Sequence, residues 1–328
     1  MFCTEGDFAE LDIEAAFGEI KANDRIYTAL SEEEGQRLRA LDAAVKETDV
    51  WQEILDDVMG IGPALGGRII SAVGDFGRFM VEPDQAQMDA LYKESVRLER
   101  EGGFKELRQF VQEGDNPFQT LQRVASWCRA NGRPTEAAKL ARAVQCHEER
   151  SKLRRDARNK TRGKLKAFMG VHLQVKIHCA SCGKFLSEGD LVDKQTGESS
   201  PLCPKCGAES IVYENVFARR RGGSVSNWHP DARQALYLLG DQFNRQSNRT
   251  RWGAMLLDYK AKFRAKHPQE TDPETGKSRY SDGHIHKMAM WRTLTKFVEW
   301  LADQWSELVR RERQAAAEAK VSKASMSA

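Results

Sequence analysis

Four cysteines in two close pairs are the residues in this sequence best placed to do chemistry. Cys179 and Cys182 form one C-x-x-C pair, Cys203 and Cys206 form a second, and twenty residues separate the pairs. A glycine follows each second cysteine, where a tight turn needs a positive φ. Four thiolates supplied in this way can surround one tetrahedral zinc ion, and two disulfides are the alternative. The spacing favours a zinc ribbon at 179–207.

The predicted zinc is structural, because a closed set of four thiolates leaves no open position for a substrate. The chain has seven cysteines, and Cys3, Cys128 and Cys146 show no evident disulfide scheme.

There is no long apolar run for a membrane span, and the amino terminus lacks the basic and apolar regions of a signal peptide. We therefore expect a cytoplasmic protein with no membrane segment.

Basic residues gather on both sides of the predicted ribbon. Residues 150–166 contain nine Lys or Arg and one acid, and Arg219, Arg220 and Arg221 follow the ribbon. Residues 1–57, by contrast, hold sixteen Asp or Glu against five Lys or Arg. A basic body predicts a polyanionic partner, with DNA the first candidate and a structured RNA the second. Charge alone leaves a merely solvated surface open as the alternative.

A glycine-rich turn precedes one of the predicted helices. Gly60 and Gly62 let the chain turn sharply, and Pro63 suits the first position of a helix, whose unpaired N–H groups can receive a phosphate. This pattern favours a helix-hairpin-helix that grips a DNA backbone, and a plain packing corner is the alternative. Gly66 and Gly67, early in the second helix, should weaken it by about 1 kcal/mol each.

Glycines that end helices and prolines that begin them divide much of the remaining chain into helices. Breaks are expected at 102–103, 114–117 and 131–134. Short β-prone runs at 173–178 and 211–217 flank the cysteine pairs. A last helix beginning near His284 carries apolar residues at near-heptad spacing. That spacing predicts intramolecular core, with a homo-oligomer seam through this carboxy-terminal helix as the alternative.

Taken in order, these motifs resemble the carboxy-terminal domain of the insertion-sequence one-ten transposases, a family of RNA-guided recombinases. The resemblance lies in 59–63 with 74–79, in 164–171, in 219–233, and in 259–268 with 283–286. It implies a role in DNA transposition or recombination. In that family an amino-terminal RuvC-like domain carries acidic metal ligands, and the carboxy-terminal domain supplies a nucleophilic serine.

This chain departs from the family at both catalytic features. The residues before the hairpin show no alternating hydrophobic strands that would build a RuvC-like sheet. No serine stands at the family's position, and Ser224 and Ser226 are the nearest. We therefore expect a transposase-derived DNA-binding protein that is not catalytic by itself. The alternatives are an active recombinase using acids from a partner or Ser224 or Ser226, and a structural zinc-ribbon scaffold.

The predicted fold is mainly α, a helical bundle with a helix-hairpin-helix motif and an inserted small β zinc ribbon. Its segments are an acidic helical segment (1–57), the hairpin (58–80), a helical region ending in a basic helix (81–163), a transposase-like core segment (164–240) containing the ribbon, carboxy-terminal helices (241–313) and a disordered tail (314–328). No catalytic residue is predicted. The predicted nucleic-acid contacts come from the hairpin, the basic stretches and the segment after the ribbon: Gly60, Ile61, Gly62, Arg68, Arg154, Arg155, Arg158, Lys164, Lys166, Arg219, Arg220, Arg221, Asn227, Trp228 and Arg233.

Overall fold

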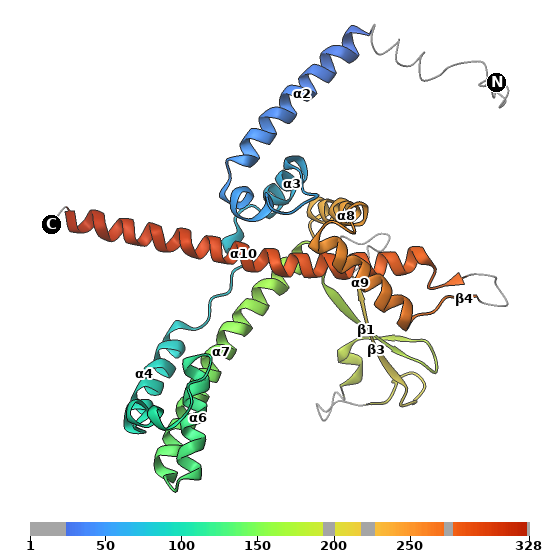
Figure 1. Cartoon of the computed structure of the whole chain (residues 1–328). Helices are drawn as coiled ribbons and strands as arrows, with labels where there is room; N and C mark the ends of the chain where they lie inside the picture. The colour runs from blue at the N-terminus through green and yellow to red at the C-terminus, as the bar shows by residue number, and fades with distance from the viewer. Residues whose placement is uncertain (1–23, 193–200, 218–226, 272–277, 327–328) are drawn as a thin grey trace. The chain divides into compact units, whose positions relative to one another are not determined.

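Helices make up most of the chain, which also contains a small antiparallel sheet (Figure 1). The computed structural model describes residues 24–192, 201–217, 227–271 and 278–326. The chain divides into two units, Met1–Gly74 with His229–Leu294 and Asp75–Trp228 with Thr295–Ala328. A mainly α fold with a small inserted sheet is therefore confirmed.

The first unit combines helices from distant parts of the sequence. Its elements are α2 (Arg25–Lys46), the π-helical turn η2 (Trp51–Leu55), α3 (Pro63–Val73), α8 (Pro230–Arg245), α9 (Arg251–Lys266), the short strands β4 (Glu270–Thr271) and β5 (Ser278–Arg279), and the start of α10 (Asp282–Met326). Asp24 caps α2 by accepting hydrogen bonds from the N–H groups of Ile26 and Tyr27. α3 packs against both α2 and α8.

The glycine-rich turn leads into α3 as the sequence predicts. Gly60 has a φ of 99°, which favours glycine, and Gly62 is the extended N-cap before Pro63 at the first helical position. The element before the turn is the short η2 rather than a regular α-helix. The turn and the following helix are therefore present, and phosphate binding by this hairpin stays a prediction.

Gly66 and Gly67 have a packing role that the sequence argument missed. A Cβ atom on Gly66 would lie 2.6 Å from a ring carbon of Trp51, and one on Gly67 would lie 2.8 Å from a methyl group of Val45. Both glycines are buried. The two glycines lower the helix propensity of α3, but they allow Trp51 and Val45 to pack directly against its backbone.

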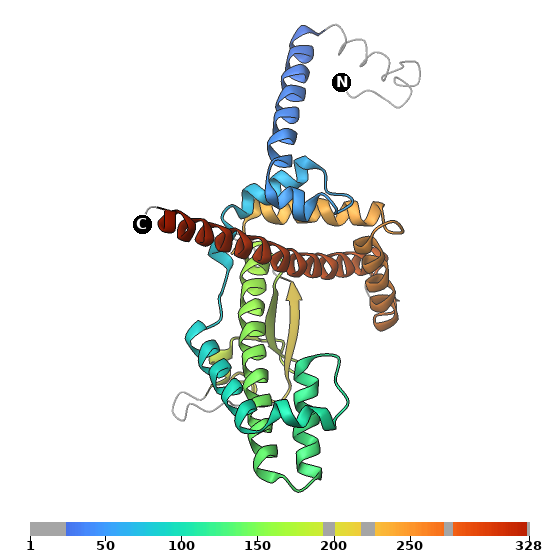
Figure 2. The same cartoon turned by 60° about the vertical axis from the view of Figure 1, so that its left-hand side comes forward.

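The second unit is built on α7 (Pro134–Phe168). α4 (Gln85–Glu101) and α6 (Pro117–Ala130) lie along the first half of α7, and the views in Figures 1 and 2 agree on this. Short helices link them, α5 (Phe104–Leu107) and η4 (Arg108–Phe110). These helices end at 101 and 130 and begin at 117 and 134, so the predicted breaks are confirmed.

The sheet of this unit follows α7 directly. β1 (Leu173–Cys179) pairs antiparallel with β2 (Phe185–Leu186) on one side and β3 (Ile211–Phe217) on the other. The register of β1 and β3 runs from Leu173 opposite Phe217 to Cys179 opposite Ile211. A short turn, η5 (Glu188–Leu191), follows β2. The two β-prone runs thus form one ribbon with the cysteine pairs at one end.

α10 contributes core to the second unit and extends further than expected. Phe297, Leu301 and Trp305 are buried, and Trp305 stacks on Phe76 of η3 (Phe76–Phe79) with ring centroids 5.1 Å apart. The heptad-like pattern therefore marks intramolecular packing. Residues 314–326, predicted to be disordered, continue α10 to Met326, because alanine-rich sequence has high helix propensity.

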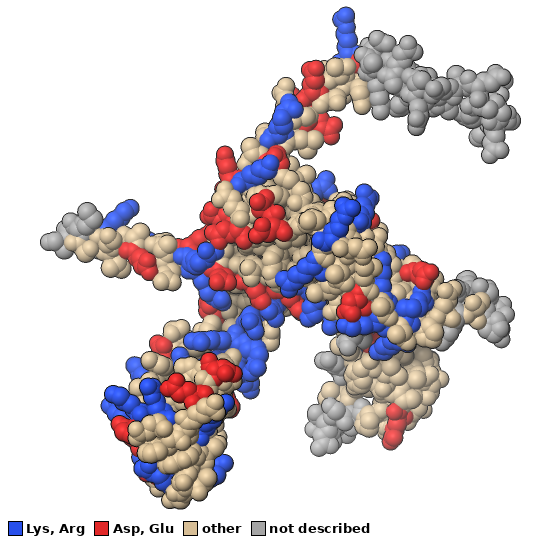
Figure 3. All heavy atoms as spheres, viewed as in Figure 1, with Lys and Arg blue, Asp and Glu red and all other residues tan. Residues whose placement is uncertain are grey.

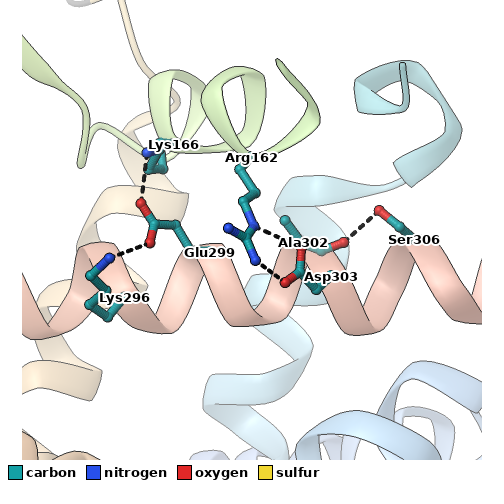
Figure 4. Close-up of polar contacts among 7 residues, drawn as sticks. All are labelled: Arg162, Lys166, Lys296, Glu299, Ala302, Asp303 and Ser306. Atoms are coloured by element: carbon teal, nitrogen blue, oxygen red, sulfur yellow. Dashed lines mark hydrogen bonds and ion pairs between the residues drawn. The ribbon is translucent and has the colours of Figure 1, made fainter. Parts of the chain in front are cut away.

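Two ion pairs join α7 to α10 (Figure 4). Two nitrogens of Arg162 donate to the Asp303 carboxylate, and Nε lies 2.8 Å from Oδ1. Lys166 Nζ lies 2.9 Å from Glu299 Oε1. Lys296 holds the other Glu299 oxygen at 2.8 Å. Burial raises the pKa of the Glu299 carboxyl, but the hydrogen bonds from Lys296 and Lys166 outweigh it and hold the pKa below its usual value.

We expect Gly66→Ala to lower the free energy of unfolding by about 1–2 kcal/mol. The new methyl group must displace the rigid Trp51 ring, and such overpacking outweighs the gain of roughly 1 kcal/mol in helix propensity. Urea unfolding measures the change. Gly35→Ala in α2 is the matched control, because its Cβ would meet nothing closer than 3.7 Å. A Gly66→Ala protein as stable as the control would contradict this packing.

We expect Glu299→Gln to cost about 1–2 kcal/mol at pH 7. Because the folded-state pKa of Glu299 is lowered, its contribution is complete above the pKa of the unfolded chain, about 4.3, and is lost as the pH falls through the lower folded value. The stability difference between wild type and variant, measured by urea unfolding, should therefore shrink in acid. Glu307→Gln, on the exposed side of the same helix, should cost little at any pH.

Candidate metal centre and basic surface

Both cysteine pairs lie in turns of the same construction. In the first turn the N–H of Gly183 donates to the carbonyl of Cys179 at 2.8 Å, and in the second the N–H of Gly207 donates to the carbonyl of Cys203 at 2.8 Å. The φ angles of Gly183 and Gly207 are 67° and 70°, in the left-handed region. The positive φ expected after each second cysteine is thus present.

The two turns bring four sulfur atoms together. All four Sγ atoms lie within 4.8 Å of one another, with Cys179 Sγ 3.5 Å from Cys206 Sγ and Cys182 Sγ 3.7 Å from Cys203 Sγ. A disulfide would need about 2.05 Å, and the four cysteines are free. Tetrahedral ligands about 2.3 Å from a shared ion stand roughly 3.8 Å apart. The cluster can therefore hold a metal ion.

Backbone N–H groups favour ionised sulfur at two of these positions. The N–H of Cys182 is the main cause that lowers the pKa of the Cys179 thiol to about 6. Burial raises the pKa of Cys203, but the N–H groups of Lys205 and Cys206 outweigh it, and the pKa is lowered. The backbone thus prepares the cluster for the thiolates that metals bind.

The cluster does not ionise completely by itself. The N–H of Ala208 lowers the pKa of Cys206, but the neighbouring thiols, Cys179 first, outweigh it and raise this pKa to about 12. Thiolates this close repel one another, so the last proton is hard to remove. A bound cation would remove that repulsion.

The remaining described cysteines do not belong to the cluster. Cys128 in α6 and Cys146 in α7 are fully buried in the core between these helices. Burial raises the pKa of both thiols, so they stay protonated. Cys3 lies outside the described residues.

The second half of α7 carries a basic surface (Figure 3). Six of its side chains are exposed, and among the residues that the structure describes none of the six pairs with a carboxylate. They are Lys152, Arg154, Arg155, Arg158, Lys160 and Lys164. We call this set the basic face. Arg150 differs, since its guanidinium lies 4.8 Å from the centre of the Tyr92 ring.

Lys166, predicted to contact nucleic acid, is paired with an acidic residue of α10 instead. Its Nζ is held by Glu299, and only 24% of its side chain is exposed. Arg162, on the same side of α7 one turn earlier, is likewise held by Asp303. Both cations contribute to the packing of α7 on α10, so we leave Lys166 out of the basic face. Sequence reasoning had no local signal for this, because both partners lie more than a hundred residues away.

The predicted contacts in the first unit have varied surroundings. Arg68 is exposed, whereas the Ile61 side chain is only 6% exposed and belongs to the core. Arg233 lies 4.8 Å from the centre of the Trp291 ring, and burial lowers the pKa of its guanidinium.

Other predicted sites follow the ribbon in sequence. Asn227 is exposed and Trp228 is half-buried. Arg219, Arg220 and Arg221, together with Ser224 and Ser226, lie outside the described residues.

None of the described helices is long and apolar enough to cross a membrane. Comparisons with known protein families, with curated proteins and with solved structures found no match for this chain.

Proposed function

We propose that this protein binds the phosphate backbone of DNA through the basic face of α7, and that a structural zinc ion in the four-cysteine cluster holds the ribbon that follows. The observation that carries the proposal is the set of six exposed cations for which the described part of the chain offers no carboxylate partner. Some exposed arginines elsewhere in the second unit have a carboxylate partner instead. Arg97 pairs with Glu94 at 2.7 Å and Arg142 with Glu149 at 3.1 Å.

The arrangement of the basic face suits backbone contacts. Lys152 and Lys164 are twelve residues apart, which corresponds to about 18 Å along a helix. Successive residues turn by about 100°, so Arg154, Arg155 and Arg158 form the side that one strand could follow, and the three lysines lie to either side of it. Arg154, Arg155 and Arg158 lie within two turns on one side of α7, and arginine forks match phosphate oxygens. Phosphates are the same at every base step, so such binding carries no sequence preference by itself.

The chemistry of the cluster favours zinc. Tetrahedral sets of four thiolates select zinc or iron. A closed four-cysteine set typically binds zinc as a structural ion. The ribbon buries only a small apolar core of Ile177, Leu186 and Leu191 beside its cysteines. A module of this size depends on its metal for stability.

The resemblance to the insertion-sequence one-ten transposases agrees with DNA as the polyanion. We propose a transposase-derived DNA-binding protein, and we assign no catalytic residue to it. A structured RNA is the alternative partner, because the same cations would contact its phosphates. Competition between duplex DNA and folded RNA for the basic face separates the two.

We expect one zinc ion per chain by elemental analysis of the purified protein. Cys203→Ser should lose the metal, and the amides of β1 and β3 should then lose protection from hydrogen exchange, because the ribbon unfolds locally. Cys146→Ala is the control and should keep the zinc. A protein that contains iron would overturn the zinc assignment. A ribbon still protected after chelation would overturn the structural role.

We expect a random 30-base-pair duplex to bind with an affinity that falls steeply with salt. Replacing Arg154, Arg155 and Arg158 together with Gln should weaken binding and flatten the slope of log affinity against log salt by about 2–3, since each lost phosphate contact removes about 0.9. Fluorescence anisotropy at several salt concentrations measures both.

The matched control removes the same charge from paired arginines. Arg97, Arg142 and Arg245 are exposed and each lies within 3.1 Å of a carboxylate. Replacing these three with Gln should leave the salt slope nearly unchanged. If both triple variants weaken binding equally, only total charge matters and the basic face is not the site.

A further inference from the structure

A cavity of about 450 Å³ opens beside the basic face, inside the second unit. It is formed by α7, by the segment before α4 and by α10. Four of its eight lining residues are arginines and only one is acidic. The lining residues are Glu82, Pro83, Ser151, Arg154, Arg155, Ala157, Arg158 and Arg310.

Buried contacts fix the walls of this cavity. The Thr161 hydroxyl accepts a hydrogen bond from the N–H of Val81 at 2.9 Å and donates to the carbonyl of Ala157 at 3.2 Å. This contact ties the segment before Glu82 to α7. On α10, Arg310 stands seven residues after Asp303, two turns along the same side of the helix, and Asp303 is held by Arg162. Core contacts therefore hold the backbone beside Glu82 and the helix that carries Arg310.

The cavity carries an excess of positive charge. Arg310 lies 3.4 Å from Glu82, which is farther apart than the pairs of Arg97 and Arg142, and both side chains are 49% exposed, so this pair is weak and open to exchange with solvent ions. Arg154, Arg155 and Arg158 have no carboxylate partner among the described residues. Four guanidinium groups facing one carboxylate repel one another unless another anion joins them.

A neighbouring cavity has a different charge balance. The neighbour, about 570 Å³, shares Ser151 and Arg155 with the first cavity. Its charged lining is balanced, since Glu148 and Glu149 accompany Lys152 and Arg155. Of these two cavities, the one at Arg310 combines several arginines with a single acid.

We propose that the Arg310 cavity binds one phosphate group of a nucleotide within a nucleic-acid chain, and that the Glu82 carboxylate occupies Arg310 until the phosphate displaces it. Guanidinium forks bind phosphate oxygens in pairs, which a single carboxylate at 3.4 Å does not match. The volume leaves room for a sugar beside the phosphate. The proposal rests on the proposed function for the source of the phosphate, and free phosphate is the other source of the same chemistry.

Opposite effects of two single substitutions test this proposal with the same 30-base-pair duplex. Arg310→Gln should weaken binding by about fivefold to tenfold, the range for loss of one charge-assisted contact. Glu82→Gln should strengthen binding by about threefold to tenfold, because the competing carboxylate is gone. Glu307→Gln is the control: it removes one exposed acid of α10 that does not line the cavity, so it measures how much binding changes from net charge alone.

The double variant separates displacement from general charge. In an Arg310→Gln background, Glu82→Gln should strengthen binding no more than Glu307→Gln does, since Glu82 then has no arginine to occupy. Equal effects of Glu82→Gln and Glu307→Gln in the wild-type background would overturn the displacement role of Glu82. Circular dichroism confirms that each variant is folded.

A second arm uses inorganic phosphate as the probe, followed by NMR of the arginine side chains. Shifts of the Arg310 resonance that saturate and vanish in Arg310→Gln support the cavity as a phosphate site. If DNA binds through α7 but neither Arg310→Gln nor phosphate has any effect, the cavity proposal fails and the proposed function stands. If phosphate binds at Arg310 but DNA does not bind at all, the proposed function fails and free phosphate is the ligand.

Discussion

The half-buried ion pairs between α7 and α10 determine which cations of α7 face solvent. Arg162 and Lys166 turn inward to Asp303 and Glu299, and Glu299 is held from a second side by Lys296. These pairs are costly to break, because each partner would be left partly buried without a counter-charge. They anchor the end of α7, and the basic side chains that they do not use, Lys164 among them, stay exposed. The same run of basic residues in α7 thus supplies both the ion pairs to α10 and the exposed basic face.

The cysteine cluster likewise needs a compensating charge. Short turns force four sulfur atoms to within 4.8 Å, where four negative charges cannot coexist without compensation. Backbone N–H groups supply part of that compensation, as the lowered pKa of Cys179 shows. A bound cation would supply the rest. The ribbon has few apolar residues to bury, so the stability of β1 and β3 depends on how this charge is balanced.

Local patterns could be predicted from the sequence, whereas contacts between distant segments could not. A C-x-x-C pair followed by glycine specifies its own turn, and glycine and proline mark helix ends within a few residues. Lys166, by contrast, was predicted to be free for nucleic acid, and its partner Glu299 lies 133 residues away. Glu82 and Arg310 are 228 residues apart and match no motif. Gly66 is explained only by the Trp51 ring against it.

Lysine footprinting tests the central claim most directly, because it reports where DNA covers the folded chain. Limited acetylation with and without duplex DNA, read by mass spectrometry, compares lysines within one sample. We expect DNA to protect Lys152, Lys160 and Lys164, and to leave the exposed Lys46 and Lys105 unchanged. Equal protection of all five, or protection of Lys46 and Lys105 alone, would contradict binding through the basic face of α7.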